Sequence, residues 1–309
     1  MQYRTLGRTG MRVSVIGLGT WQFGGEWGHA YTQGEVDAVF DAARDCGINL
    51  LDTAECYGDH LSEKLCGQAI KKDRERWVVA TKFGHQFHAN FERTEPRRPE
   101  DIQQQLEASL KALQTEAIDL YQYHSFGSSE FFDDDVLAVL HKAKDAGKVR
   151  HLGNSARNKD DQHEQVAASQ QRGIEAVQLV YNRLQRLPEE NGTLDLCRQQ
   201  NLGVLARVPL ASGYLSGKYD PEAEFAAGEV RGRHDPEHRR SMLESVQQIA
   251  RDEVPEGTPM AQWALAWCLQ HPAVTCVIPG CKRPAQVENN AAVASLDLAA
   301  GDHPQAVGD

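Results

Sequence analysis

The stretch Ile48-Asn-Leu-Leu-Asp52-Thr-Ala-Glu-Cys-Tyr57-Gly58 joins an apolar run to a carboxylate and a phenol. The apolar residues predict a short strand that ends near Asp52. Two later runs repeat the design, because Trp77–Lys82 ends in a lysine and Ile118–His124 ends in a histidine. Polar ends of neighbouring parallel strands meet at the carboxyl-terminal edge, where parallel barrels build their active sites. The predicted catalytic residues are Asp52, Tyr57, Lys82 and His124.

Strand-like and helix-like segments alternate along most of the chain. Such alternation requires parallel pairing with right-handed crossovers. Eight units without a break in composition predict an α/β fold, a closed (β/α)8 TIM barrel. The predicted strands are Val15–Gly19, Asn49–Asp52, Trp77–Lys82, Ile118–His124, Arg150–Ser155, Ala176–Tyr181, Gly203–Val208 and Val274–Pro279.

The segments outside the repeat also carry signals. Gly7-Arg-Thr-Gly10 lies between two short strand-like runs, so residues 1–15 predict a hairpin that caps the barrel bottom. We expect residues 1–309 to form a single domain and the Ala/Gly-rich residues 297–309 to be a frayed tail. The long connections Phe83–Arg98 and Tyr219–Arg240 follow the third and seventh strands, which favours lids over the site.

Composition limits the possible partners and compartment. With 33 basic and 44 acidic side chains, the net charge of −11 argues against nucleic-acid and membrane-surface partners. No run approaches the roughly 18 apolar residues of a membrane span, and the first residues lack the apolar segment of a secretory signal. Seven cysteines without a C-x-x-C pair predict free thiols in a reducing compartment, so we expect a cytoplasmic protein. The oligomeric state is left open.

The four predicted residues suit proton transfer to a carbonyl oxygen. A phenol has a pKa of about 10, and an adjacent ammonium would lower that pKa. Asp52 could hold Lys82 beside Tyr57, and His124 could position the oxygen. This chemistry fits a carbonyl that gains a proton while a nucleophile attacks its carbon. Hydride is one such nucleophile, but the four residues alone do not name it.

Several motifs over residues 2–296 resemble the aldo-keto reductases, in order and spacing. They are Gly17-Leu-Gly-Thr-Trp21, Asp52-Thr-Ala-x-x-Tyr57-Gly58, Ser62-Glu63, Ala80-Thr-Lys82, Asp119-Leu-Tyr-x-x-His124, Gly153-x-Ser155, Gln178-x-x-Tyr-Asn182, Pro209-Leu-x-Ser-Gly-x-Leu-x-Gly-Lys-Tyr219 and Ile278-Pro-Gly280. The chain is most similar to the small bacterial branches related to the potassium-channel β-subunits.

The resemblance implies an NADPH-dependent oxidoreductase that reduces small aldehydes or ketones to alcohols, with Tyr57 as proton donor. It implies NADP(H) rather than NAD(H), and no metal. The residues implied to bind the cofactor are Thr20, Trp21, Ser155, Gln178, Arg207, Pro209, Leu210, Ser212, Leu215, Gly217, Lys218, Gly280, Lys282, Gln286, Asn289 and Asn290. Ser155 and Gln178 would bind the carboxamide of the nicotinamide. Lys282 and Arg283 would neutralise the 2′-phosphate of NADP(H).

Three positions depart from the family pattern. Ala156 stands in place of the usual asparagine, Asn289 in place of a frequent glutamate, and Arg207 in place of the aromatic that stacks on the nicotinamide. Arg207 would repel an oxidised nicotinamide, which favours reduced cofactor, or it turns towards an anionic substrate. These departures keep a second function open, an NADP(H)-sensing regulatory subunit with slow reductase chemistry.

Two further groups of residues allow alternative interpretations. Aromatic residues in or near the expected top-face loops are either a substrate pocket or ordinary packing. They are Trp21, Phe23, Trp27, Phe87 and Phe126. Arginines cluster in the second long connection, as a solvated face or as a flap that contacts cofactor phosphates. They are Arg231, Arg233, Arg239 and Arg240.

Overall fold

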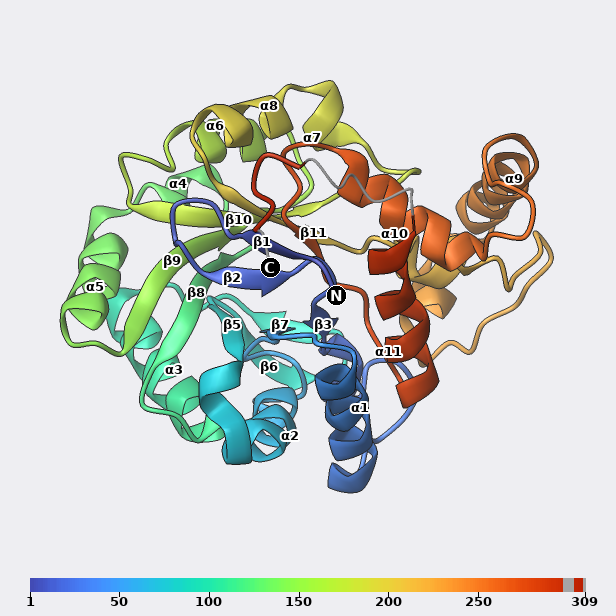
Figure 1. Cartoon of the computed structure of the whole chain (residues 1–309). Coiled ribbons are helices and arrows are strands. Elements are labelled where there is room, and N and C mark those ends of the chain that lie inside the picture. Colours follow the sequence, from blue (N-terminus) through green and yellow to red (C-terminus); the bar gives the residue numbers. More distant parts are fainter. Residues whose placement is uncertain (297–302, 308–309) are drawn as a thin grey trace.

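Eight parallel strands lie side by side in the computed structural model, which describes residues 1–296 and 303–307 (Figure 1). In chain order they are β3 (Leu18–Gly19), β4 (Leu50–Asp52), β5 (Val78–Phe83), β8 (Ile118–His124), β9 (Val149–Ser155), β10 (Ile174–Val180), β11 (Gly203–Arg207) and β12 (Cys276–Val277). The first and last strands also meet, since the Gly17 N–H donates to the Val277 carbonyl at 2.8 Å. The sheet therefore closes, and the predicted (β/α)8 barrel is confirmed.

Helices surround the barrel (Figure 1). They are α1 (Gln33–Asp45), α2 (Leu61–Ile70), α3 (Pro99–Leu113), α4 (Ser128–Phe131), α5 (Asp134–Asp145), α6 (Asp161–Ala167), α7 (Leu187–Glu190), α8 (Thr193–Gln199), α9 (Pro236–Asp252), α10 (Met260–Gln270) and α11 (Pro284–Ala291). In α1, the buried Val36, Val39 and Phe40 recur at helical spacing, which explains why this face packs inward. Within the described ranges, no helix has both the length and the apolar character to cross a bilayer.

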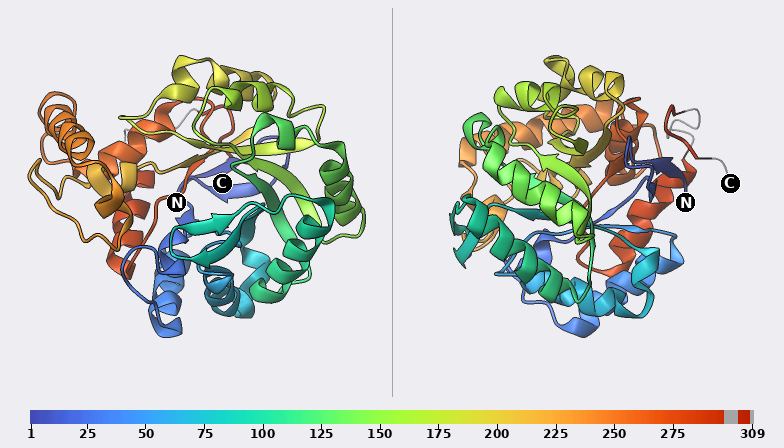
Figure 2. Two further views of the ribbon diagram at one scale, coloured as in Figure 1. Left: turned by 180° about the vertical axis from the view of Figure 1, so that it is seen from behind. Right: turned by 90° about the vertical axis from the view of Figure 1, so that its left-hand side faces the viewer.

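The predicted N-terminal hairpin is present and closes one end of the barrel. It consists of β1 (Tyr3–Thr5) and β2 (Arg12–Ser14), which pair antiparallel. Leu6 and Val13 are fully buried and pack against barrel-interior residues such as Leu50 and Leu205. The side view in Figure 2 shows this hairpin at the end opposite a second hairpin, formed by β6 (Gln86–Ala89) and β7 (Glu92–Thr94). The cap therefore shields the apolar interior from water, as expected from the sequence.

The expectation of a frayed tail is wrong for residues 303–307. The Thr5 N–H donates to the Gln305 carbonyl at 2.8 Å, and the Val307 N–H donates to the Tyr3 carbonyl at 3.0 Å. The Gln305 side chain also bonds the Thr275 hydroxyl at 2.6 Å. Backbone pairing with β1 thus fixes a segment whose composition suggested disorder. The rest of the predicted tail, 297–302 and 308–309, lies outside the described residues.

The two long connections contain secondary structure that the sequence did not predict. The first holds a hairpin, β6 (Gln86–Ala89) and β7 (Glu92–Thr94), whose mostly exposed residues lack the alternation of a half-buried strand. The second holds a short 3-10 helix, Val230–Arg233, and the first turn of α9. Seen from behind, the β6–β7 hairpin crosses the barrel mouth (Figure 2). The role of either connection as a lid stays a prediction.

Candidate active site

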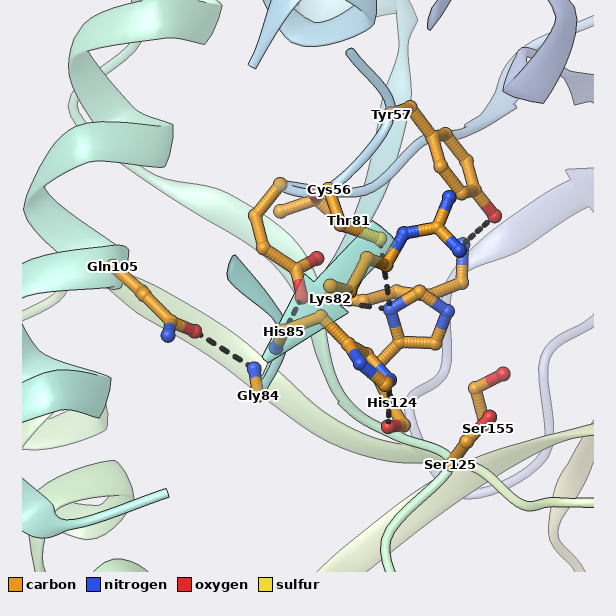
Figure 3. Close-up of polar contacts among 12 residues, drawn as sticks. Cys56, Tyr57, Thr81, Lys82, Gly84, His85, Gln105, His124, Ser125 and Ser155 are labelled. Atoms are coloured by element: carbon orange, nitrogen blue, oxygen red, sulfur yellow. Dashed lines mark hydrogen bonds and ion pairs between the residues drawn. The ribbon is translucent and has the colours of Figure 1, made fainter. Parts of the chain in front are cut away.

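Neighbouring strands bring the four predicted catalytic residues together. Asp52 ends β4, Lys82 lies near the end of β5 and His124 ends β8, and these strands are adjacent in the sheet. Tyr57 follows in the turn between β4 and α2. The Gly24 backbone packs directly on this turn, because a Cβ at Gly24 would lie 2.6 Å from the Tyr57 carbonyl carbon. The phenol is thereby held over the carboxyl ends of the strands (Figure 3).

Lys82 is the centre of the polar group. Its side chain is 1% exposed, and its Nζ donates to Asp52 Oδ2 at 2.8 Å and to the Thr53 carbonyl at 2.7 Å. The third contact is the Tyr57 hydroxyl at 3.3 Å (Figure 3). An ammonium has three N–H donors, so the three contacts use its full donor capacity. The carboxylate, ammonium and phenol are therefore fixed relative to one another.

The phenol keeps its proton in this environment. Burial raises the pKa of Tyr57 to about 12, although the nearby Lys82 charge acts to lower it. The expectation that Lys82 would bring this pKa down is therefore wrong on balance, since desolvation of a phenolate outweighs the attraction. Burial also disfavours the Lys82 ammonium, but Asp52 and Tyr57 outweigh it and raise the pKa of Lys82. The site combines a neutral phenol with a charged ammonium.

His124 completes the group as a neutral ring. Its Nδ1 lies 3.7 Å from Cys56 Sγ and 3.5 Å from Glu55 Oε1. Burial, aided by the Lys82 charge, holds the pKa of His124 well below its usual value. The His124 and Tyr57 rings are 6.2 Å apart and nearly perpendicular. A neutral imidazole at this position can hydrogen-bond an oxygen placed between the two rings.

The Asp52 carboxylate is also held from its other side. Gln178 on β10 donates through Nε2 to Asp52 Oδ1 at 2.7 Å. Ser155, at the end of β9, donates to Gln178 Oε1 at 3.1 Å. Two residues expected to bind the carboxamide therefore belong to the hydrogen-bond network of the four central residues.

A cavity of about 430 Å³ opens over these residues. Asp52, Tyr57 and His124 line it, together with many of the residues expected to bind cofactor. The latter are Thr20, Trp21, Gln178, Arg207, Pro209, Leu210, Ser212, Lys218, Gly280, Lys282 and Gln286. The expected residues that do not line it are Ser155, Leu215, Gly217, Asn289 and Asn290.

Three of these exceptions have clear physical causes. Leu215 is fully buried in an apolar cluster with Tyr214 and Leu243. The Asn290 amide donates to Cys281 Sγ at 3.2 Å, and the Asn289 side chain accepts from Gln262 Nε2 at 3.0 Å. Their side chains are occupied within the protein.

The expected substrate pocket is only partly correct. Trp21 and Trp27 line the cavity, with ring centroids 5.3 Å apart. Phe23 and Phe126 are instead fully buried core residues, so ordinary packing explains both. Phe87 lines a separate cavity of about 200 Å³ beside α3. Periodicity cannot distinguish an aromatic that faces a cavity from one that faces the core.

Several lining residues were not predicted to bind cofactor or substrate. They are Gly19, Gln22, Cys56, His85, Arg93, Ser125, Val208, Gly213, Ser216, Tyr219, Ile278 and Pro279. Arg93 pairs with the buried Glu26, and both Glu26 oxygens lie 2.6 Å from its Nη2. This pair joins two loops far apart in sequence, so no local spacing indicates it.

The arginine cluster divides between its two interpretations. Arg231 lines the cavity and is 8% exposed, which agrees with a flap. The Arg233 guanidinium lies 4.6 Å from the centre of the Phe91 ring. Neither Arg239 nor Arg240 lines the cavity, and Arg240 forms surface pairs with acids.

The cavity suits an anionic dinucleotide. The lysines Lys218 and Lys282 line it and could neutralise phosphates. Trp27 lies near both Lys282 and Trp21, since its ring is 5.0 Å from Lys282 Nζ and 5.3 Å from the Trp21 ring. The Trp21 ring in turn is 6.2 Å from Tyr57. One long ligand could therefore reach both the cations and the phenol.

A closed parallel barrel with a polar site at the carboxyl ends of its strands has the architecture of a barrel enzyme. The sequence profile of the Aldo/keto reductase family matches residues 15–306. The chain therefore belongs to the aldo/keto reductase family of oxidoreductases, and the resemblance seen in its motifs is confirmed.

Relatives of the chain include enzymes and channel subunits. It is 33% identical to an NADH-specific methylglyoxal reductase of Escherichia coli, over 96% of this chain and 94% of the relative. It is 32% identical to a putative voltage-gated potassium channel subunit beta of Schizosaccharomyces pombe, over 96% and 89%. The solved holo structure of aldo-keto reductase AKR11C1 from Bacillus halodurans is similar, with a TM-score of 0.79 and 27% identity over 96% and 91% of the chains.

Proposed function

We propose that this protein is a cytoplasmic, NADPH-dependent reductase that converts small aldehydes or ketones to alcohols. The observation that carries the proposal is the contact between the Tyr57 hydroxyl and the buried Lys82 ammonium, 3.3 Å apart beside the cavity. A nicotinamide cofactor, when bound, supplies the hydride for the carbonyl carbon.

The residues of the chain would manage the proton and the oxygen. Tyr57 donates its proton to the carbonyl oxygen as the carbon is reduced. Lys82 stabilises the phenolate that forms, and Asp52 keeps Lys82 charged and in place. The neutral His124 ring donates a hydrogen bond that fixes the carbonyl oxygen, while Trp21 and Trp27 provide an apolar wall.

The choice of NADP(H) rests on positive charge near the eighth strand. Lys282 lines the cavity and Arg283 follows it at the start of α11. Both could neutralise a 2′-phosphate, which only NADP(H) carries. The double variant Lys282→Met/Arg283→Met is expected to raise KM for NADPH at least tenfold and KM for NADH little. Equal effects on the two cofactors would contradict the preference.

A variant that lacks the hydroxyl oxygen of Tyr57 tests the proposed reductase activity. Tyr57→Phe is expected to abolish oxidation of NADPH by methylglyoxal or a nitrobenzaldehyde, while NADPH still quenches protein fluorescence. Tyr121→Phe is the matched control, because the Tyr121 hydroxyl is buried in the core and has no hydrogen-bond partner within residues 1–296 and 303–307. Turnover by Tyr57→Phe would exclude Tyr57 as the donor.

Wild-type protein that binds NADPH tightly but reduces no carbonyl would support the alternative of a nucleotide-sensing subunit. The similarity to a putative potassium channel subunit beta of S. pombe and the position of Arg207 in the cavity support this alternative. A wide panel of aldehydes and ketones separates the two functions.

A further inference from the structure

Arg207 places a positive charge in the catalytic cavity. It ends β11 and lines the cavity together with Asp52, Tyr57 and His124. Its Nη2 donates to the Ala156 carbonyl at 3.1 Å, and its buried Nε has no hydrogen-bond partner among the described residues. Within residues 1–296 and 303–307, no carboxylate forms an ion pair with Arg207. The donor capacity of this guanidinium is largely unused.

The other arginines that line the cavity are neutralised. Arg93 contacts both oxygens of Glu26, and Arg231 pairs with Glu229 at 2.9 Å. Asp52 also lines the cavity, but Lys82 and Gln178 already occupy its two oxygens. In the part of the chain that the structure describes, the charge of Arg207 is therefore left without a balancing anion.

A partly buried charge without a counter-ion is costly, whereas a charged hydrogen bond in a desolvated site is strong. A ligand with a carboxylate or phosphate would supply the missing counter-ion and accept charged hydrogen bonds from Arg207. Because Arg207 lines the cavity beside Tyr57 and His124, the residues proposed to act on the carbonyl, the anionic group would belong to the substrate. A guanidinium can hold either anion through two parallel N–H donors.

We propose that Arg207 is a specificity-determining residue that binds the carboxylate or phosphate of an anionic aldehyde or ketone. This inference rests on the proposed reductase function. The anion and the guanidinium are unchanged by the reaction. Hydride adds to the carbonyl carbon, the C=O π bond breaks, and the proton on the oxygen comes from Tyr57. Arg207 thus acts on substrate binding, so its contribution should be found mainly in KM.

Pairs of related aldehydes, one anionic and one neutral, test the proposal. For the carboxylate, 4-carboxybenzaldehyde is compared with 4-nitrobenzaldehyde, and for the phosphate, glyceraldehyde 3-phosphate is compared with glyceraldehyde. Arg207→Met is expected to lower kcat/KM for at least one anionic substrate about ten- to a hundredfold, the range of a charge-assisted hydrogen bond. For the neutral partners the change should stay below about threefold. The pair that responds identifies the anion.

Two further variants separate charge from structure. Arg207→Lys should restore part of the preference for the anion, because it keeps the charge but loses the planar donors. Arg157→Gln is the matched control, since Arg157 is already paired with Asp161. Thermal unfolding and NADPH titration of each variant report on folding and on cofactor binding.

The possible failures are distinct. Equal losses for charged and neutral substrates, together with weaker NADPH binding, would assign Arg207 to the cofactor and overturn the inference. The inference would also be overturned if the wild-type enzyme reduces 4-nitrobenzaldehyde but Arg207→Met leaves kcat/KM for both anionic substrates unchanged. In that case the reductase function would stand. No turnover of any substrate would remove the reductase function itself.

Discussion

Tyr57 and Lys82 are in hydrogen-bond contact at 3.3 Å, yet the phenol holds its proton more tightly than a phenol in water. The reason is burial, which disfavours the phenolate more than the ammonium favours it. Tyr57 is therefore in its protonated, donor form throughout the neutral pH range, and the phenolate that would remove a proton from an alcohol is scarce.

The pH dependence should differ between the two directions of the reaction. With the pKa of Tyr57 raised to about 12, the proton donor is present throughout the neutral range. We expect kcat for aldehyde reduction to be flat from about pH 6 to about pH 9, and kcat for alcohol oxidation to rise towards tenfold per pH unit. Steady-state kinetics in both directions provide the measurement. A fall in reduction with a midpoint near pH 8 would be inconsistent with this state of Tyr57.

Removal of the Asp52 charge should lower the free energy of unfolding as well as the activity. Asp52→Asn leaves the buried Lys82 ammonium without its counter-ion, and loss of one partner of such a pair costs about 3–5 kcal/mol. Urea unfolding should show this loss. The matched control is Asp41→Asn, whose exposed pair with Arg44 is expected to contribute about 0–1 kcal/mol.

The double variant Asp52→Asn/Lys82→Met separates stability from catalysis. It removes both charges, so most of the free energy of unfolding should return while turnover stays low. If the double variant were as unstable as Asp52→Asn alone, the unpaired ammonium would not be the cause.

The hairpin cap predicts a contrast between two glycines. Gly7 has a φ of +50°, and an added Cβ would lie 2.0 Å from the Gly203 nitrogen. Gly10 has a φ of +69°, but no atom of the residues that the structure describes lies within 4 Å of its Cβ position. Gly10→Ala should cost about 1–2 kcal/mol from the left-handed backbone alone. Gly7→Ala should cost clearly more, because the cap must also move away from β11. If Gly7→Ala and Gly10→Ala unfolded at the same urea midpoint, close packing of the cap on β11 would be disproved.

Stability should fall in mild acid because of His85. Burial, with the His124 ring beside it, lowers the pKa of His85 to about 4. The unfolded chain binds this proton near pH 6.5, so the stabilisation is fully present above that pH and is lost as pH falls towards 4. The loss should reach about 1–3 kcal/mol. His85→Gln should reduce the acid sensitivity, whereas His88→Gln, exposed on the same hairpin, should not. Identical acid profiles for both variants would contradict the assignment.

The barrel and the four central residues could be predicted because their signals are local. Each strand is a short apolar run, and Asp52, Lys82 and His124 are fixed to strand ends by the chain itself. Once the strands are parallel neighbours, the side chains must meet. The same reasoning explains the cap, because the two glycines of its turn mark a reversal between strand-like runs.

What the sequence did not reveal depends on contacts between distant segments. Phe126 and Phe23 lie beside residues that line the cavity, yet they point into the core, and no spacing distinguishes the two directions. The pKa of Tyr57 depends on how deeply the phenol is buried, and the charges expected beside it do not reveal that burial. Gln305 pairs with β1 across nearly the full length of the chain, a contact that composition could not indicate.

Glu26 and Arg93 have a consequence for efforts to change the specificity of this protein. The Glu26 carboxylate is fully buried and accepts from the Trp21 indole, the Phe91 N–H and the Arg93 guanidinium, so it ties the loop after β3 to the β6–β7 hairpin. A transplant of either loop alone from a relative would leave a buried charged side chain without its partner. Library designs and chimaeras should therefore exchange the two loops as a single cassette.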